Sequence, residues 1–321
     1  MPELVWLLHG LSLPCVKFIG RATEKKKTDM IINEYCKDCQ IRRNLNKYPS
    51  SAPAFKIEAY QHGVMEIIAH CDGLSTPQIS EKMYALRLEH FGSAKDYTET
   101  KRHFNALMLG LLPYMQEQVA NADDPLRMAL QYSMVGNFID FGIMDDVDEN
   151  ELRSKLEAAK YIAIDPGMIQ SFSREVEKAH RLVFFTDNCG EIVTDKLLIS
   201  VLHGLNPQLQ VTVIVRGKPV VNDATMEDAF QVGMQDVAQS VIGNGAGMPG
   251  NVIGAISSEA MDEISNADVL VSKGQGNFEG LSGCGLNIFY LFLCKCDAFT
   301  QRFNVPRFTG VMTRESEIPK V

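Results

Sequence analysis

The stretch LVFFTDNCGEIVTDKLL, residues 182–198, shows how a central part of this chain folds. Its first four residues are apolar and predict a buried strand, and apolar residues at helical spacing predict a helix over residues 191–202. Asp187 and Asn188 therefore lie between the end of a strand and the start of a helix, which is where open α/β sheets bind ligands. A helix N-terminus attracts phosphate whereas Asp187 repels it, and a divalent cation between them removes that conflict. The stretch predicts a metal-dependent enzyme that acts on phosphates.

Length and composition indicate a soluble globular protein. The chain has 321 residues, and its net charge is −9. Residues 25–27 are the one notable block of basic side chains, so we expect no nucleic-acid partner. The eight cysteines are scattered and do not form a dense disulfide pattern, which favours the reducing cytoplasm. The sequence leaves the oligomeric state open.

The N-terminal segment is apolar but does not resemble a targeting or membrane signal. Residues 4–20 are short for a membrane span, and Glu3 stands where a signal peptide would carry Lys or Arg. We therefore expect no membrane partner. Residues 1–29 are expected to be a non-native or disordered extension, with the native start near Met30.

The rest of the chain divides into a helical part and an alternating part. Helical spacing recurs in residues 30–173, and Pro113 is expected to kink or end the third helix. From residue 180 onward, strands alternate with helices, which predicts an α/β fold with a largely parallel sheet and flanking helices. An N-terminal all-helical domain (30–173) would precede the α/β domain that binds metal and phosphate (174–321). The expected helices are 53–71, 80–90, 97–112, 124–136, 152–162, 192–202, 226–233, 258–264 and 279–281, and the expected strands are 182–185, 211–215, 237–242, 269–272 and 288–293.

A second acidic residue follows the second strand of the alternating part. Asp223 lies after the strand at 211–215, so it should stand at the same sheet edge as Asp187. Two carboxylates and the amide oxygen of Asn188 are hard ligands that suit Mg²⁺ or Mn²⁺ better than zinc. Each of the three residues taken alone is more simply explained as a helix cap. Taken together, and beside the motif that follows, they favour a metal site.

The third motif, VSKGQGNFEG at residues 271–280, also follows a strand. Glycines such as Gly274 let backbone N–H groups approach an anion, and Lys273 supplies a positive charge. A glycine-rich turn alone is weak evidence. Here the lysine stands at a strand end, opposite the acids, so a cation for the phosphate faces carboxylates for a metal.

These three motifs resemble the signatures of the domain of unknown function 89 family, the metal-dependent damage-control phosphatases. The matching segments are DNCGEIV at 187–193, RGKPVVNDAT at 216–225 and SKGQGNFE at 272–279. YCKDC at 35–39 resembles the Cys-x-x-Cys of the prokaryotic branch of that family, and GNFIDFG at 136–142 resembles another segment of that branch. The resemblance runs from about residue 30 to the C-terminus. Cys189 departs from it, because a small residue, commonly alanine, is expected there.

The resemblance implies a helical domain packed on an α/β sheet and the hydrolysis of small phosphorylated metabolites. It also implies a divalent metal, which the sequence leaves as Mg²⁺, Mn²⁺, Co²⁺ or Ni²⁺. By position it assigns Asp187, Asn188 and Asp223 to the metal and Lys273 to the phosphate. It also favours a role for Asn137 at the site.

The expected reaction is attack on the phosphoryl group by a metal-activated water. Lys273 and the backbone amides of residues 188–191 are expected to stabilise the charge on the phosphoryl oxygens. Glu191 either orients a metal-bound water or favours the first turn of its helix. Asp187 as a covalent nucleophile is less favoured, because a metal-bound carboxylate is a poor nucleophile. The expected catalytic residues are Asp187, Lys273 and Glu191, and the expected substrate-binding residues are Lys273, Gly274, Asn137, Asn188 and Gly190.

Two other functions stay open. One is an S-adenosylmethionine-dependent carboxyl methyltransferase, which is disfavoured because the first strand–helix turn holds one glycine, Gly190, where that cofactor usually needs several. The other is a non-catalytic protein that binds a metal or a phosphorylated metabolite.

Cys36 and Cys39 fit half a zinc site, a redox pair or core packing, and packing is favoured. The sequence does not specify which phosphorylated metabolite would be the substrate.

Overall fold

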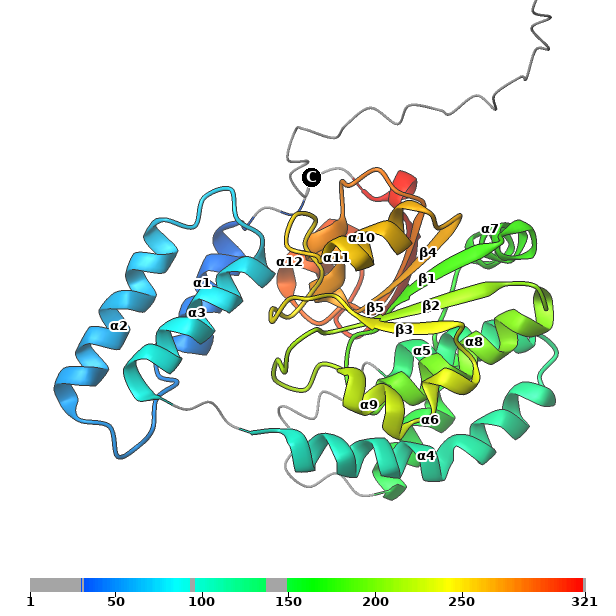
Figure 1. The fold of residues 1–321 in the computed structure, drawn as a ribbon, viewed down its shortest axis with the longest axis horizontal. Helices are drawn as coiled ribbons and strands as arrows, with labels where there is room; N and C mark the ends of the chain where they lie inside the picture. Colours follow the sequence, from blue (N-terminus) through cyan, green and yellow to red (C-terminus); the bar gives the residue numbers. More distant parts are fainter. Residues whose placement is uncertain (1–29, 31, 93–95, 137–148, 320–321) are drawn as a thin grey trace, which may run out of the picture.

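The computed structural model describes residues 30, 32–92, 96–136 and 149–319. The expected extension at residues 1–29 and the predicted site residue Asn137 lie outside the described residues. Figure 1 shows the arrangement of the described part, in which a twisted sheet carries helices on both faces and a group of three helices stands to one side.

Six strands form one sheet in the order β3-β2-β1-β4-β5-β6. All neighbouring strands are parallel except β6, which pairs antiparallel with β5. The prediction of an α/β fold with a largely parallel sheet is confirmed. Strand β6 was not predicted, and β3 begins three residues later than expected. The strands are β1 (Arg181–Phe185), β2 (Gln210–Val215), β3 (Ser240–Gly243), β4 (Val269–Lys273), β5 (Ile288–Leu293) and β6 (Gly310–Arg314).

Most helices occur close to where apolar spacing predicts them, but α7 (Pro166–Lys178) and α12 (Asp297–Phe303) were not among the expected helices. Helix α4 continues through Pro113 to Ala120, so it does not end at this proline, which was one of the two outcomes predicted there. A proline costs the helix one hydrogen bond, but Leu111, Met115 and Val119 are buried on either side of it and keep the helix against the core. The helices are α1 (Glu34–Asn44), α2 (Ala54–Ala69), α3 (Thr76–Phe91), α4 (Thr98–Ala120), α5 (Pro125–Gly136), α6 (Glu149–Ala158), α7 (Pro166–Lys178), α8 (Glu191–Leu205), α9 (Met226–Gln231), α10 (Ser258–Ser265), α11 (Gln275–Leu281) and α12 (Asp297–Phe303).

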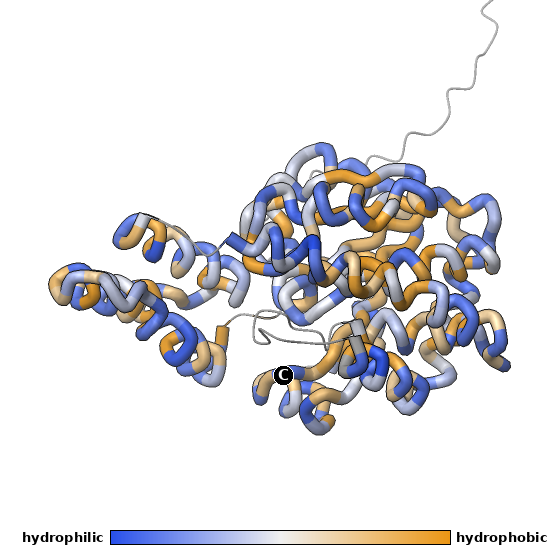
Figure 2. Tube along the Cα trace, turned by 90° about the horizontal axis from the view of Figure 1, so that it is seen from below, coloured by the Kyte–Doolittle hydropathy of each residue, from blue (hydrophilic) through white to orange (hydrophobic). Residues whose placement is uncertain are grey.

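Both faces of the sheet are buried, because successive residues of a strand point to opposite sides. In β1, Leu182 and Phe184 join a core with α4–α8, whereas Val183 and Phe185 join a core with α1–α3 and α10–α12. Figure 2 shows apolar positions, in orange, and hydrophilic positions, in blue, mixed along the chain. The continuous apolar run at 182–185 is thus explained by burial on both sides.

The helices before β1 belong to two different parts of the structure. Helices α1–α3 form a lobe beside the sheet, whereas α4–α7 share the apolar core beneath it (Figure 1). The expected domain boundary at residue 173 falls within α7. A polar loop after β3 contacts the lobe, because Gly250 lies against Pro77 of α3. The carboxyl ends of the strands therefore face the α1–α3 lobe.

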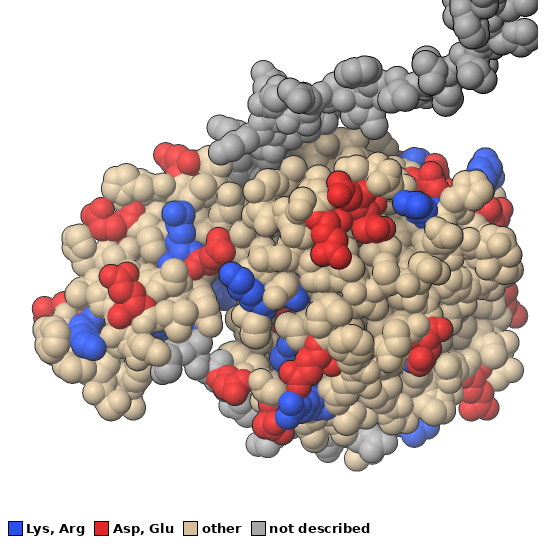
Figure 3. Space-filling model, in the orientation of Figure 1, with Lys and Arg blue, Asp and Glu red and all other residues tan. Residues whose placement is uncertain are grey.

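The strand order places two loops at a crevice. The chain runs from β1 outward through β2 to β3 and then returns to β4 on the other side of β1. Such a reversal separates the loops that follow β1 and β4 and opens a crevice at the carboxyl ends of these strands. Asp187 follows β1, and Lys273 ends β4. Figure 3 shows acidic and basic side chains in small separate groups on one face of the molecule.

No helix in the described ranges is long and apolar enough to cross a membrane.

Glu279 of α11 is a buried acid at the contact between the α1–α3 lobe and the sheet. Burial raises the pKa of its carboxyl group from 4.5 to about 7, although a hydrogen bond from Thr76 and the charge of Arg43 oppose this shift. The folded protein then holds a proton that the unfolded chain releases at lower pH. The acid therefore lowers stability progressively as the pH rises from 4.5 to about 7, and the full cost applies above that range.

We predict that Glu279→Gln removes this pH-dependent cost. Between about pH 5 and about pH 8 the variant should gain about 2 kcal/mol of unfolding free energy relative to the wild type. Urea unfolding of both proteins at the two pH values measures the difference. Glu259→Gln, which alters an exposed acid on α10, is the control and should follow the wild type. Identical pH profiles for Glu279→Gln and the wild type would contradict the prediction.

Candidate active site

The loops after β1 and β2 are joined by backbone hydrogen bonds that bring the predicted metal ligands together. Asn188 and Asp223 form an antiparallel bridge. The amide of Ala224 donates to the carbonyl of Asp187 at 2.8 Å, and the amide of Cys189 donates to the carbonyl of Asn222 at 2.8 Å. Asp187, Asn188 and Asp223 therefore lie side by side at the crevice, as the sequence predicted.

Arg216 lies between the two acids. This residue follows β2, and its side chain is 1% exposed. Its Nε donates to Asp223 Oδ2 at 2.6 Å, its Nη2 to Asp187 Oδ1 at 3.4 Å and its Nη1 to Asn277 Oδ1 at 2.9 Å. Sequence analysis placed Arg216 in a motif but gave it no role. The available signal was a charged residue directly after a buried strand.

Burial raises the pKa of both carboxylates despite their contacts with Arg216. Burial, together with the charges of Glu191 and Asp223, raises the pKa of Asp187 to about 8, and Arg216 and Lys295 only partly oppose this. Burial also raises the pKa of Asp223, although its contact with Arg216 acts in the other direction. A cation at this point would stabilise the ionised form of both acids.

The donor set fits a hard divalent cation. The described residues contain no group of three Asp, Glu, His or Cys side chains that could hold a metal. A cation here would instead take two carboxylates and one amide oxygen, and would leave other positions to water and phosphate, as Mg²⁺ commonly does. Asn188 is oriented for this role, because its Nδ2 donates to Asp187 Oδ2 at 2.9 Å and to Glu191 Oε2 at 3.2 Å. Its Oδ1 is then the amide atom left to bind a cation.

The ammonium group of Lys273, which was predicted to bind phosphate, is enclosed by acceptors of the protein. Its ammonium group is fully buried and donates to Glu191 Oε1 at 2.7 Å, to Asp195 Oδ1 at 2.6 Å and to the carbonyl of Ser133 at 2.8 Å. An ammonium group has three hydrogens, and these contacts use all of them. To bind phosphate, Lys273 would have to leave one of these acceptors.

The backbone amides of residues 188–191 are also engaged, in contrast to the expectation that they stabilise a phosphate. The amide of Gly190 donates to Asn105 Oδ1 at 2.7 Å, and that of Asn188 to Glu191 Oε2 at 3.4 Å. The amides of Cys189 and Glu191 donate to backbone carbonyls at 2.8 and 2.7 Å. The start of α8 is therefore held by the protein itself. Asn105 of α4, which the sequence offered only as a weak candidate, supports it through the amide of Gly190.

Gly274 provides space for Asp187. Its φ is 78°, a conformation that residues with a Cβ rarely adopt, and a Cβ built there would overlap the Asp187 carboxylate. The expected role of Gly274 was to let backbone amides approach a phosphate. The structure adds a simpler requirement, because a larger residue at this position would displace a predicted metal ligand.

Lys295 is a positive charge at this edge of the sheet that sequence analysis did not assign to the site. It follows β5, its backbone amide donates to Gln275 Oε1 at 2.9 Å, and its charge lowers the pKa of Asp187. Only its position after a predicted strand could have indicated it. Its half-buried side chain contrasts with the enclosed ammonium of Lys273.

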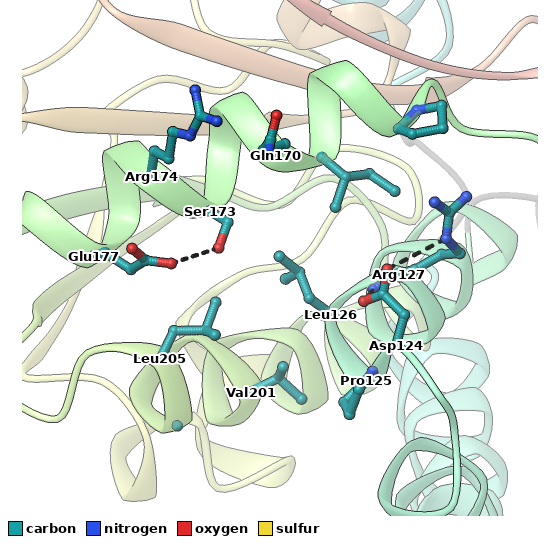
Figure 4. A pocket seen from close by; sticks show the side chains of 13 residues that line it. Asp124, Pro125, Leu126, Arg127, Gln170, Ser173, Arg174, Glu177, Val201 and Leu205 are labelled. Atoms are coloured by element: carbon teal, nitrogen blue, oxygen red, sulfur yellow. Dashed lines mark hydrogen bonds and ion pairs between the residues drawn. The ribbon is translucent and has the colours of Figure 1, made fainter.

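A groove of about 800 Å³ lies at the other end of α8 from this cluster. Figure 4 shows two pairs among its polar side chains, Arg127 with Asp124 and Ser173 with Glu177. It contains none of the predicted site residues, so we do not assign the reaction to it. Its lining residues come from the start of α5, from α7 and from the end of α8.

A profile of the "Damage-control phosphatase ARMT1-like domain" matches residues 21–310. The chain belongs to this family.

Two similar archaeal proteins carry the same function in their names. A damage-control phosphatase of Archaeoglobus fulgidus is 31% identical over 256 residues, which cover 78% of this chain and 84% of that protein. A damage-control phosphatase of Pyrococcus horikoshii is 33% identical over 194 residues, which cover 59% of this chain and 64% of that protein. Together with the family match, the names of these relatives support a phosphatase that acts in damage control.

A solved structure shares the fold. The crystal structure of a DUF89 family protein from Pyrococcus horikoshii superposes with a TM-score of 0.75 and 23% identity, and the match covers 88% of this chain and 99% of that one. At this identity the likeness is evidence for the fold alone. The resemblance inferred from the three sequence motifs is confirmed.

Cys189 and Cys36 behave as buried packing residues in the structure. Cys189, which departs from the family pattern, is fully buried, and burial raises the pKa of its thiol far above its ordinary value. Burial likewise raises the pKa of Cys36 to about 11. Both thiols are therefore protonated near neutral pH, which suits a small buried side chain better than a reactive thiolate.

Proposed function

We propose that this phosphatase hydrolyses small phosphate monoesters and needs a divalent metal held by Asp187, Asn188 and Asp223. The observation that carries the proposal is the meeting of two buried acids and an oriented amide at the crevice between β1 and β4. Burial and the charges of Glu191 and Asp223 raise the pKa of Asp187 to about 8, so a further positive charge would favour its ionised form. A bound cation would supply this charge, neutralise phosphoryl oxygens and acidify a water.

Other side chains around the proposed metal ligands have separate roles. Arg216 holds the two acids in place through hydrogen bonds to both. Glu191 accepts the Asn188 amide and thereby orients a ligand. Lys295 lies at the rim and is the residue we assign to the phosphate, since the ammonium of Lys273 is enclosed. Asp187 is 14% exposed and Asp223 is 8% exposed, so a small phosphorylated metabolite fits this site better than a macromolecular phosphate.

Metal removal tests the proposal directly. Metal-stripped protein should release no phosphate from p-nitrophenyl phosphate or from a panel of sugar phosphates, and Mg²⁺, Mn²⁺, Co²⁺ or Ni²⁺ added singly should restore release. The metal that restores it best identifies the preferred ion. Glu259→Gln, altered on the exposed face of α10, is the control and should respond like the wild type.

Two results would overturn the proposal in different ways. Turnover that persists unchanged in stripped protein would show that no metal is required. Metal binding without turnover of any phosphate ester would show that the protein binds a metal but is not a phosphatase.

A further inference from the structure

Three charged side chains form a fully buried cluster behind the proposed metal site. Lys273 of β4 lies between Glu191 and Asp195, which are one turn apart on α8, and all three side chains are 0% exposed. Ser133 of α5 supplies two further contacts, because its carbonyl accepts from Lys273 and its hydroxyl donates to Asp195 Oδ1 at 2.9 Å. Asp195 was not among the residues that sequence analysis singled out.

A continuous series of hydrogen bonds leads from this cluster to the site. Asp195 and Glu191 both accept from Lys273, and the second oxygen of Glu191 accepts from Nδ2 of Asn188 at 3.2 Å. The other Nδ2 hydrogen of Asn188 is directed to Asp187 at 2.9 Å. The orientation of the Asn188 amide therefore depends on Glu191, and the position of Glu191 depends on Lys273.

The cluster is poorly explained by stability alone. Two carboxylates share one ammonium group in a region without solvent, and Asp195 Oδ2 is a buried oxygen with no hydrogen-bond partner among the described residues. Replacing a buried ion pair with apolar side chains of similar size is often neutral or stabilising. An incompletely satisfied buried acid therefore points to a role other than holding the fold together.

We propose that Asp195 is a positioning residue for the metal site. By holding Lys273 against Glu191, it keeps Glu191 where it receives the Asn188 amide, so that Asn188 Oδ1 remains the atom offered to a cation. Lys273 then acts through Glu191 and does not bind the phosphate. This inference rests on the proposed metal-dependent function, and it concerns hydrogen-bonded partners of a ligand, whose loss commonly weakens metal binding.

Binding of Mn²⁺ to metal-stripped protein can be measured by titration calorimetry or by the electron paramagnetic resonance signal of the free ion. This measurement does not depend on turnover. Asp195→Asn should weaken Mn²⁺ binding about tenfold to hundredfold. Asp236→Asn is the matched control, because Asp236 also pairs with a lysine of α8, Lys196, but stands outside the cluster. It should bind Mn²⁺ like the wild type.

A second variant separates positioning from folding. Asp195→Leu removes one of the two buried carboxylates and leaves Lys273 paired with Glu191, so no buried charge is left without a partner. We expect a folded protein with a thermal midpoint close to that of the wild type, and its Mn²⁺ affinity should still fall. Wild-type affinity in this folded variant would overturn the inference while leaving the metal site intact. A wild type that binds no Mn²⁺ would instead overturn the proposed function.

Lys273→Met alone distinguishes the positioning role from a phosphate contact. In the positioning role the variant binds Mn²⁺ more weakly, and saturating metal restores the KM for the phosphate ester. Unchanged Mn²⁺ affinity with a KM that stays high at saturating metal would assign Lys273 to the phosphate and overturn the inference.

Discussion

Replacing Asp187 with asparagine is expected to lower metal-dependent phosphate release by about 10³-fold or more, which corresponds to about 4 kcal/mol of transition-state stabilisation. The change removes a charged ligand but keeps the shape of the side chain. The fold should not suffer, because the pKa of Asp187 is raised to about 8 and the ionised acid therefore lowers stability as the pH rises toward that value. We expect the unfolding free energy of the variant to equal or exceed that of the wild type near neutral pH.

Phosphate release, Mn²⁺ binding and thermal unfolding should be measured together on Asp187→Asn and on the control Asp236→Asn. Loss of turnover and of Mn²⁺ binding with an unchanged thermal midpoint fits a metal ligand. Turnover close to the wild-type rate would show that Asp187 takes no part in the reaction. A large fall in the thermal midpoint would show that Asp187 stabilises the folded protein.

Replacing Arg216 with methionine is expected to destabilise the protein by about 3–5 kcal/mol, because it leaves buried charges without their partner. Arg216 contacts Asp187, Asp223 and Asn277, and its side chain is 1% exposed. Methionine fills part of the volume but donates no hydrogen bond to any of the three. A divalent metal should recover part of the loss, since an ion that binds only the folded protein stabilises it.

Urea unfolding with and without Mn²⁺ measures both effects for Arg216→Met. Arg102→Met is the control, because Arg102 pairs with Glu99 and Glu227 at an exposed position, and its loss should leave stability nearly unchanged. Equal stability of Arg216→Met and the wild type would show that the buried acids are satisfied without the guanidinium group. An absent Mn²⁺ effect would separate Arg216 from the metal site.

Much of the α/β part was predictable because its signals are local. Buried parallel strands appear as short apolar runs, so β1, β2, β4 and β5 were predicted within a residue or so of their ends. Strand β6 escaped prediction because it lies at the sheet edge and pairs on one side only, so buried positions alternate with partly exposed ones and form no continuous apolar run. The course of α4 through Pro113 also depends on its burial against other elements.

The candidate site was likewise predictable only in part. Asp187, Asn188 and Asp223 were predictable as neighbours, because residues after adjacent parallel strands meet at one sheet edge. The direction of a long side chain is not encoded locally. Lys273 is the last residue of β4, one position beyond the predicted strand end, and its ammonium group turns toward Ser133, 140 positions away in the chain, and toward two acids of α8.

The sequence by itself determined which residues stand at the carboxyl ends of the strands, because strand burial and the strand-to-helix turn depend on neighbouring residues. Tertiary structure alone decided which of them face one another. Arg216 between the acids, Asp195 behind Lys273 and Asn105 beneath Gly190 all join elements distant in the chain. Their contacts follow from the removal of charged and polar groups from water, which forces each group to find a partner wherever the fold provides one.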